Sequence, residues 1–172
     1  PIKVVANLPY YITTPIIMGL FESRVPLKSI TIMVQKEVAD RLSEKPGSKI
    51  YGTPSVKLAW YGTAERVGVI GRNVFWPAPN VDSALVLFKR YPGGHTPAAD
   101  NADGSVVDRE TVFRLIDAAF GQRRKTLHAA LKKIVPSKAF EKAGIDPTRR
   151  GETLTIDEFV ALARALDEVF AS

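Results

Sequence analysis

The strongest constraint on the fold is a change in hydrophobic pattern at Tyr91. Up to this residue, apolar runs of strand length alternate with segments whose apolar residues have helical spacing. A stretch of small and polar residues, "PGGHTPAADNADGS", then leads to a region in which every apolar pattern is helical. The sequence therefore predicts an α/β part at residues 1–91, a linker at 92–107 and an all-helical part at 108–172.

The α/β part contains a series of predicted strands and helices. The strands are expected at residues 2–6, 29–34, 64–71 and 83–91. The helices are expected from Thr13 or Thr14 onward, at 35–44 and at 53–62. This alternation implies a parallel sheet with right-handed crossovers. The apolar run Ile2–Ala6 is typical of a strand that is buried on both faces of such a sheet.

The helical part shows apolar residues at helix spacing throughout. Its helices are expected at residues 108–120, 125–134, 137–144 and 155–170. The last of them starts with the capping-box pattern, because Thr155 is followed three positions later by Glu158.

The composition favours a globular protein with an anionic partner. The 172 residues carry a formal net charge of +6, and the pI is near 9.6. No apolar run reaches the roughly 18 residues of a membrane span, and there is no cysteine for disulfides or thiolate metal sites. These features fit a cytoplasmic location. His95 and His128 have no ligand partners at metal-site spacing, so no metal is expected. A chain that starts at Pro1 within a strand pattern reads as the later part of a longer protein.

The positive charge is concentrated in one stretch. Residues 122–150 contain nine Lys or Arg and only two Asp or Glu, which is typical of a surface that binds nucleic-acid phosphates. A solvated helix face is the alternative. The candidate RNA-binding residues are Arg123, Arg124, Lys125, Lys132, Lys133, Arg149 and Arg150. For any one of them, an intramolecular role stays open.

The first predicted strand ends in Asn7-Leu8-Pro9-Tyr10. In open α/β sheets, ligands bind outside the carboxyl ends of the strands. The Asn7 side-chain carbonyl and a backbone carbonyl beside Pro9 could accept both hydrogens of an exocyclic amine, and Tyr10 offers a flat face for a base. Proline has no N–H and fixes the backbone, so these carbonyls can be held rigidly. An Asn-Pro strand stop with a packed tyrosine explains the same residues without a ligand.

Six segments in order resemble one family, the small-subunit ribosomal RNA adenine dimethyltransferases. They are "NLPYYITTPI", "QKEVADRL", "YGTPSV", "VFWPAPNVDSALV", "FGQRRKTL" and "GIDPTRRGETLT". The resemblance implies the C-terminal part of a Rossmann-like class I methyltransferase sheet followed by a small helical rRNA-binding domain. It also implies S-adenosyl-L-methionine as methyl donor, dimethylation of N6 on two adjacent adenosines near the 3′ end of small-subunit (16S) rRNA, and a 30S pre-ribosomal particle as partner.

The resemblance also implies roles for particular residues. Asn7, Leu8 and Pro9 would orient the adenine amine, and Asn7 would also touch the methyl donor. Tyr10 and Phe75 would sandwich the flipped base. The prolines that follow Phe75 could hold its ring above the sheet end, whereas the neighbouring Trp76 is expected in the core.

One expected feature is not found in the sequence. A cofactor-binding half should show a Gly-rich turn after a strand, and "GVIG" at 68–71 has the wrong spacing. The family places this turn upstream of Pro1. We therefore expect the chain alone to be inactive and not to bind the cofactor, and we expect self-association through the sheet surface that the missing strands would cover. Two other functions stay open: a large-subunit rRNA methyltransferase of the macrolide-resistance type, and a non-catalytic ribosome-assembly or RNA-binding module.

Overall fold

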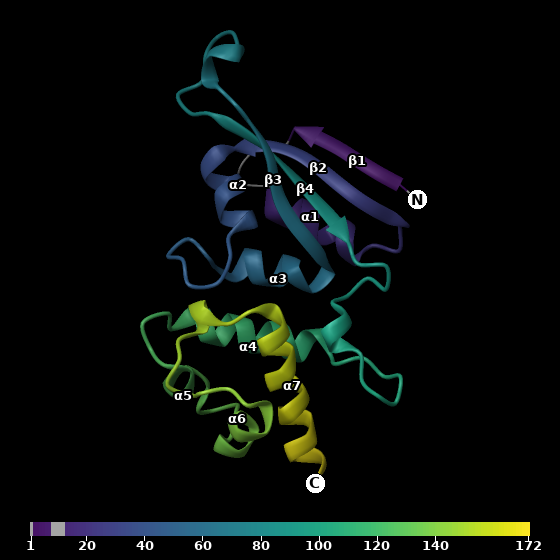
Figure 1. Ribbon diagram of the computed structural model, residues 1–172, viewed down its shortest axis with the longest axis vertical. Helices are drawn as coiled ribbons and strands as arrows, with labels where there is room; N and C mark the ends of the chain where they lie inside the picture. Colours follow the sequence, from purple (N-terminus) through teal and green to yellow (C-terminus); the bar gives the residue numbers. More distant parts are fainter. Residues whose placement is uncertain (1, 8–12) are drawn as a thin grey trace. The chain divides into compact units, whose positions relative to one another are not determined.

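The chain forms two compact units, each of which is described separately. The computed structural model describes residues 2–7 and 13–172 (Figure 1). One unit, called the sheet unit here, consists of Pro1–Glu44 and Leu58–His95; the other, the helical unit, consists of Lys45–Lys57 and Thr96–Ser172. The segment from Lys45 to Lys57 thus leaves the sheet unit and returns to it, although its own contacts lie in the helical unit.

The sheet unit is built on four strands in the order β1-β2-β4-β3 (Figure 1). They are β1 (Ile2–Asn7), β2 (Leu27–Gln35), β3 (Gly62–Ile70) and β4 (Ser83–Arg90). β1 pairs with β2 in parallel, whereas β4 runs antiparallel to both of its neighbours. The expected all-parallel sheet is therefore wrong for the second half of this unit. The connection between β3 and β4 contains only a short 3-10 helix, Arg72–Val74, and no crossover helix, so the chain returns antiparallel.

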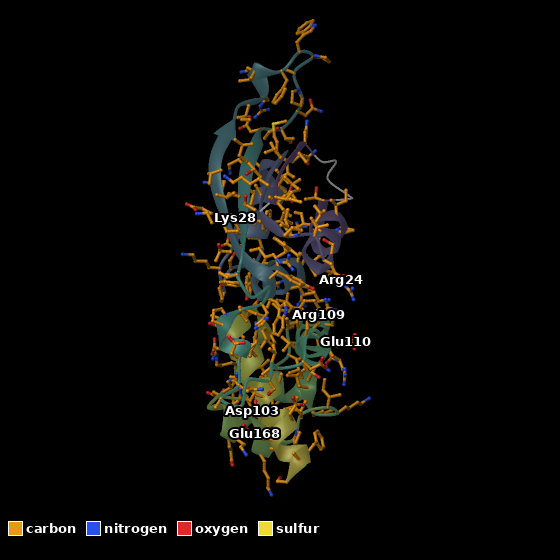
Figure 2. The ribbon with its side chains drawn as sticks, turned by 90° about the vertical axis from the view of Figure 1, so that its right-hand side faces the viewer. Arg24, Lys28, Asp103, Arg109, Glu110 and Glu168 are labelled. Atoms are coloured by element: carbon orange, nitrogen blue, oxygen red, sulfur yellow. The ribbon has the colours of Figure 1, made fainter. Side chains whose placement is uncertain are left out.

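Helices cover one face of this sheet. The predicted helices are present as α1 (Thr13–Glu22), α2 (Lys36–Ser43) and α3 (Thr53–Tyr61). The ring of Phe21 on α1 lies 6.3 Å from that of Phe88 on β4 and 5.6 Å from that of Tyr61. The strand residues on this face are fully buried: Ile30, Ile32, Val34, Ala84, Val86 and Phe88. In Figure 2 the teal strands and the purple helix α1 form separate layers.

The opposite face of the sheet is open in the described residues. Val5 is 82% exposed, and its pairing partner Thr31 and the next residue across, Leu87, are only half-buried. The expectation that Ile2–Ala6 is buried on both faces is therefore wrong. β1 is an edge strand, and the burial of its neighbours lies on the face that α1 and α2 cover.

The helical unit contains the remaining predicted helices. They are α4 (Arg109–Gly121), α5 (Leu127–Leu131), α6 (Ser137–Ala143) and α7 (Ile156–Ala171). Their apolar faces form a core whose largest buried side chains are Leu115, Ile116, Leu127, Leu131, Phe140, Leu154 and Phe159. The segment before α4 is also ordered, with a short 3-10 helix, Pro97–Ala99, and a bridge between Asp100 and Val106.

Side chains cap three helices of this unit, α4, α5 and α7. Asp108 accepts a hydrogen bond from the Thr111 N–H at the start of α4. At α7 the predicted capping box is confirmed: Thr155 accepts from the Glu158 N–H, and Glu158 accepts from the Thr155 N–H. Both pairs satisfy backbone donors that have no partner within the helix.

Candidate functional site

The sheet register brings three strand ends to one edge. Asn7 pairs with Met33 on β2, which pairs with Leu85 on β4. Two residues further along β2, Gln35 pairs with Ser83, which pairs with Ile70 at the end of β3. The carboxyl ends of β1, β2 and β3 therefore meet where the β3–β4 loop begins. In an open α/β sheet this is the edge at which ligands bind.

Of the predicted base-binding tetrapeptide, the structure describes Asn7. This residue is exposed at the last position of β1, as an Asn that presents its amide to a ligand would be. Leu8, Pro9 and Tyr10 lie outside the described residues.

The loop at residues 71–82 is held closed by contacts between its two ends. The Arg72 N–H donates to Asp82 Oδ1 at 2.9 Å, and the Arg72 guanidinium donates to the Asn80 carbonyl at 3.0 Å. The Asp82 carbonyl in turn accepts from the Lys36 N–H at 2.9 Å, which ties the loop to the start of α2. The sequence did not point to Arg72 or Asp82, because a contact between loop ends leaves no periodic pattern.

The loop carries Phe75 to the same edge as Asn7. Phe75 is half-buried. The strand that follows the loop, β4, is separated from β1 by β2 alone, which corresponds to about 10 Å at the usual interstrand spacing. Trp76, expected in the core, is 96% exposed, so this expectation is wrong. The loop extends beyond the strands of the sheet in Figure 1.

The predicted RNA-binding residues divide into two groups in the helical unit. Those with exposed side chains are Arg124, Lys125, Lys132, Lys133 and Arg150. Three of them, Lys125, Lys132 and Lys133, line a hollow of about 270 Å³ together with Gln122. Such a group of cations around a small hollow can hold an anion. Arg123 and Arg149 form the second group, because their guanidinium groups are engaged within the protein.

Arg123 is bound by a loop of its own unit. Its Nε donates to Glu152 at 3.0 Å, and its Nη2 donates to the carbonyls of Lys49 and Tyr51, both at 2.7 Å. Its guanidinium also lies over the ring of Phe120, 5.7 Å from the centroid. These contacts occupy the planar group that phosphate recognition would use.

Arg149 pairs with the cap of α7. Its guanidinium donates to both carboxylate oxygens of Glu158 and to the Thr153 carbonyl, the last at 2.8 Å. The hydrogen bond from Arg149 holds the pKa of Glu158 below its ordinary value, and the same bond raises the pKa of Arg149. Glu152 and Glu158, the partners of the two arginines, were not singled out in the sequence.

Glu37, in the first turn of α2, and the two histidines have ordinary surroundings. Glu37 is exposed and pairs with Arg41 one turn later on α2, at 3.5 Å. The His95 ring lies 6.1 Å from that of Trp60, and His128 is exposed on α5. Residues 2–7 and 13–172 contain no group of three or more His, Cys, Asp or Glu arranged to hold a metal. In the same residues, no helix is long and apolar enough to cross a membrane.

Two solved structures have a similar fold. The chain is similar to a dimethyladenosine transferase from Plasmodium falciparum, with a TM-score of 0.74 and 24% identity over 93% of this chain and 65% of that one. It is also similar to the 23S rRNA methyltransferase ErmE, with a TM-score of 0.69 and 22% identity over 97% of this chain and 66% of that one. At these identities the likeness defines the fold class, the class I methyltransferase fold.

The sequence match is more specific than the fold. Residues 1–168 match the family model described as "Ribosomal RNA adenine dimethylase", and the chain belongs to this family. A relative from Bifidobacterium adolescentis, "Ribosomal RNA small subunit methyltransferase A", is 90% identical over 168 residues. That match covers 98% of this chain and 55% of the relative, so the chain spans about half the length of the curated relatives it matches. The resemblance found in the sequence motifs is confirmed.

The pairing of Arg149 with Glu158 predicts a pH-dependent loss of stability. Because the folded-state pKa of Glu158 lies below its ordinary value of 4.5, the pair stabilises the fold fully above that value and is lost as the pH falls through the folded-state pKa. Glu158→Gln keeps a side chain that can complete the capping box but removes the charge. We expect it to lower the free energy of unfolding at pH 7 by roughly 1 kcal/mol, the upper end for partly exposed pairs.

Urea unfolding of both proteins between pH 3 and 7 measures this effect. The difference in free energy of unfolding between wild type and Glu158→Gln should shrink toward pH 3. The matched variant Glu141→Gln, at an exposed position of α6, should unfold like wild type at every pH. A difference that stays constant with pH would contradict an ionic contribution from Glu158.

Proposed function

We propose that the longer protein to which this chain corresponds dimethylates N6 of two adjacent adenosines near the 3′ end of small-subunit (16S) rRNA. The observation that supports this proposal best is that residues 1–168 match the ribosomal RNA adenine dimethylase family, together with 90% identity to a small-subunit methyltransferase. The rRNA would be met in a cytoplasmic 30S pre-ribosomal particle. Residues 1–91 would act as the target-base part of the enzyme and residues 108–172 as its rRNA-binding domain.

The sheet edge would hold the target base. The target adenosine must leave its stack to reach any active site. Asn7 would accept a hydrogen from the exocyclic amine, and the carbonyls of Leu8 and Pro9 would complete the acceptor set. This leaves the amine lone pair less committed to the ring and better placed to attack a methyl carbon. Phe75 and Tyr10 would stack on the base, a contact worth about 1–3 kcal/mol.

The exposed cations would hold the RNA backbone. Arg124, Lys125, Lys132, Lys133 and Arg150 are exposed, and no ion pair joins their side chains to other described residues. Each such cation can neutralise a phosphate, and this gives an affinity that falls with salt. We keep Arg123 and Arg149 out of this set, because both guanidinium groups are bound by their own unit.

The described residues fit only one side of the S-adenosyl-L-methionine site. When bound, this cofactor supplies the electrophilic methyl group. Asn7 offers an exposed amide beside the place where the methyl group would arrive. The expected Gly-rich turn after a parallel strand is not among the positive-φ glycines, which are Gly47, Gly94, Gly104 and Gly144. None of these four follows β1 or β2 directly, so we derive no step through the cofactor.

Full-length protein with Phe75→Ala should lose about 5- to 150-fold in kcat/KM for small-subunit methylation, which corresponds to one lost stacking contact. Phe75→Tyr should retain most activity. Val74→Ala, at the 74% exposed position beside it, is the matched control and should resemble wild type. Asn7→Ala should lose more than Phe75→Ala, because it removes the amide that orients the amine.

Transfer of radiolabelled methyl groups to purified 30S and 50S particles measures these rates and also separates the alternatives. Methylation of 50S particles alone would favour the large-subunit type. Full-length Asn7→Ala that keeps both particle binding and the cellular effect of wild type would favour a non-catalytic assembly role.

The 172-residue chain by itself should not bind S-adenosyl-L-methionine measurably, because Asn7 is the single predicted cofactor contact in it. Isothermal titration of the chain, with full-length protein as the positive control, measures this. Micromolar binding by the chain would contradict the assignment of the cofactor site to the rest of the protein.

The chain should also self-associate through the open face and edge of its sheet. Val5 is 82% exposed on the edge strand β1, and an exposed edge with apolar side chains is a template for pairing. Light scattering at several concentrations should give a mass that rises with concentration. Val5→Lys should reduce this rise, whereas Val106→Lys, at a 44% exposed position of the helical unit, should not. A constant monomer mass for wild type would contradict the prediction.

A further inference from the structure

A loop between α2 and α3 is fastened to the helical unit by Arg123. The loop, residues 45–52, is called the clamped loop here. Arg123 Nη2 donates to three of its backbone carbonyls, those of Ser48, Lys49 and Tyr51, at 3.3, 2.7 and 2.7 Å. Three carbonyls on one guanidinium nitrogen, with Glu152 on Nε, fix the path of the loop around this side chain.

Further contacts hold the clamped loop in the same place. The Gly47 N–H donates to the Glu152 carbonyl at 2.8 Å. The Tyr51 hydroxyl donates to the Leu154 carbonyl at 2.7 Å in the buried interior, and the Tyr51 ring meets that of Phe120 edge-on at 5.9 Å. Burial raises the pKa of Tyr51, so its hydroxyl stays a proton donor in this bond. The loop is therefore anchored at both ends, with Arg123 in the middle.

The clamped loop presents a cation that the RNA-binding prediction did not include. Lys49 is exposed, and no hydrogen bond or ion pair joins its amine to other described residues. Its own carbonyl lies 2.7 Å from Arg123 Nη2. Arg124 and Lys125, both exposed, follow Arg123 directly in the chain. The hydrogen bonds from Arg123 thus hold the backbone of Lys49 next to the start of the basic stretch at residues 122–150.

We propose that Lys49 contacts an RNA phosphate and that Arg123 is a positioning residue, which holds Lys49 in place rather than binding RNA itself. This inference rests on the proposed function, because the RNA is the rRNA substrate proposed above. Arg123 suits the role because its five donors lie in a rigid plane that can serve several carbonyls at once. A lysine at this position keeps the charge but cannot reproduce that geometry.

The salt dependence of RNA binding by Arg123→Lys distinguishes a positioning role of Arg123 from a direct phosphate contact. The affinity for RNA falls as salt rises, and each phosphate contact adds about 0.9 to the steepness of log affinity against log salt. A variant that lacks one contact should therefore show a fall in affinity between 50 and 200 mM salt that is about threefold smaller than that of wild type. We expect this change for Lys49→Gln, and also for Arg123→Lys although the charge is kept. The double variant should equal either single variant, because Lys49 contributes nothing once its loop is released.

The measurement is titration of the 172-residue chain with an rRNA fragment that carries the two target adenosines, at several salt concentrations. Hydrogen exchange at Gly47 and Tyr51 reports the order of the loop without RNA, and should speed up in Arg123→Lys but not in Lys49→Gln. Glu152→Gln weakens the contact that holds the Arg123 guanidinium, and it should also make the salt dependence of RNA binding less steep. Lys49→Arg should restore wild-type binding, and Lys138→Gln, an exposed lysine on α6, is the matched charge control.

Several results would overturn the inference. Arg123→Lys with a wild-type slope, or Glu152→Gln with higher affinity than wild type, would make Arg123 itself the phosphate contact. Lys49→Gln with a wild-type slope, or Lys138→Gln with an equal loss, would remove the specific role of Lys49. If the wild-type chain binds no rRNA under any condition, the RNA-binding part of the proposed function fails as well, whereas the other results leave that part intact.

Discussion

The insertion of β4 between β2 and β3 is the constraint on which the candidate site depends. Because β4 runs antiparallel to both neighbours, the chain must turn back after β3 at the carboxyl edge of the parallel strands. That edge is where an open α/β sheet binds its ligands. The return path therefore becomes a loop over the ligand-binding edge. A parallel β4 would instead have required a crossover that carries the chain from this edge to the opposite edge before β4 begins.

The loop can serve as part of a site because its ends are fixed independently of its tip. The bonds among Arg72, Asn80, Asp82 and the Lys36 N–H join both ends of the loop to each other and to α2. Prolines restrict the backbone between those ends. The position of Phe75 then follows from the sheet register and a closed base, rather than from packing of its ring in the core. This explains how the Phe75 ring can remain half-buried, with part of its surface open to a ligand, next to the exposed Trp76.

Local features of the sequence were sufficient to predict the helices and strands, including the capping box at Thr155 and Glu158. The periodicity and the caps act over a few residues, so one sequence contains them. The strand order and direction could not be derived in this way, because pairing joins Ser29 to Lys89 and Lys89 to Thr63 across the chain. Burial of Ile2–Ala6 was overestimated for the same reason: an apolar run does not state whether its strand lies at an edge.

The basic stretch shows why charge density alone does not identify contacts with RNA. Among its nine cations, Arg123, Lys142 and Arg149 form ion pairs with Glu152, Glu168 and Glu158. The two arginine partners lie 29 and 9 residues away in the sequence, so neither pair follows from local spacing. A phosphate that bound Arg149 would have to displace the carboxylate that completes the cap of α7. A phosphate at Arg123 would release a loop held by three carbonyl bonds. Binding at the exposed cations would require neither change, so under the proposed function RNA binding and the folding of the helical unit would depend on different charges.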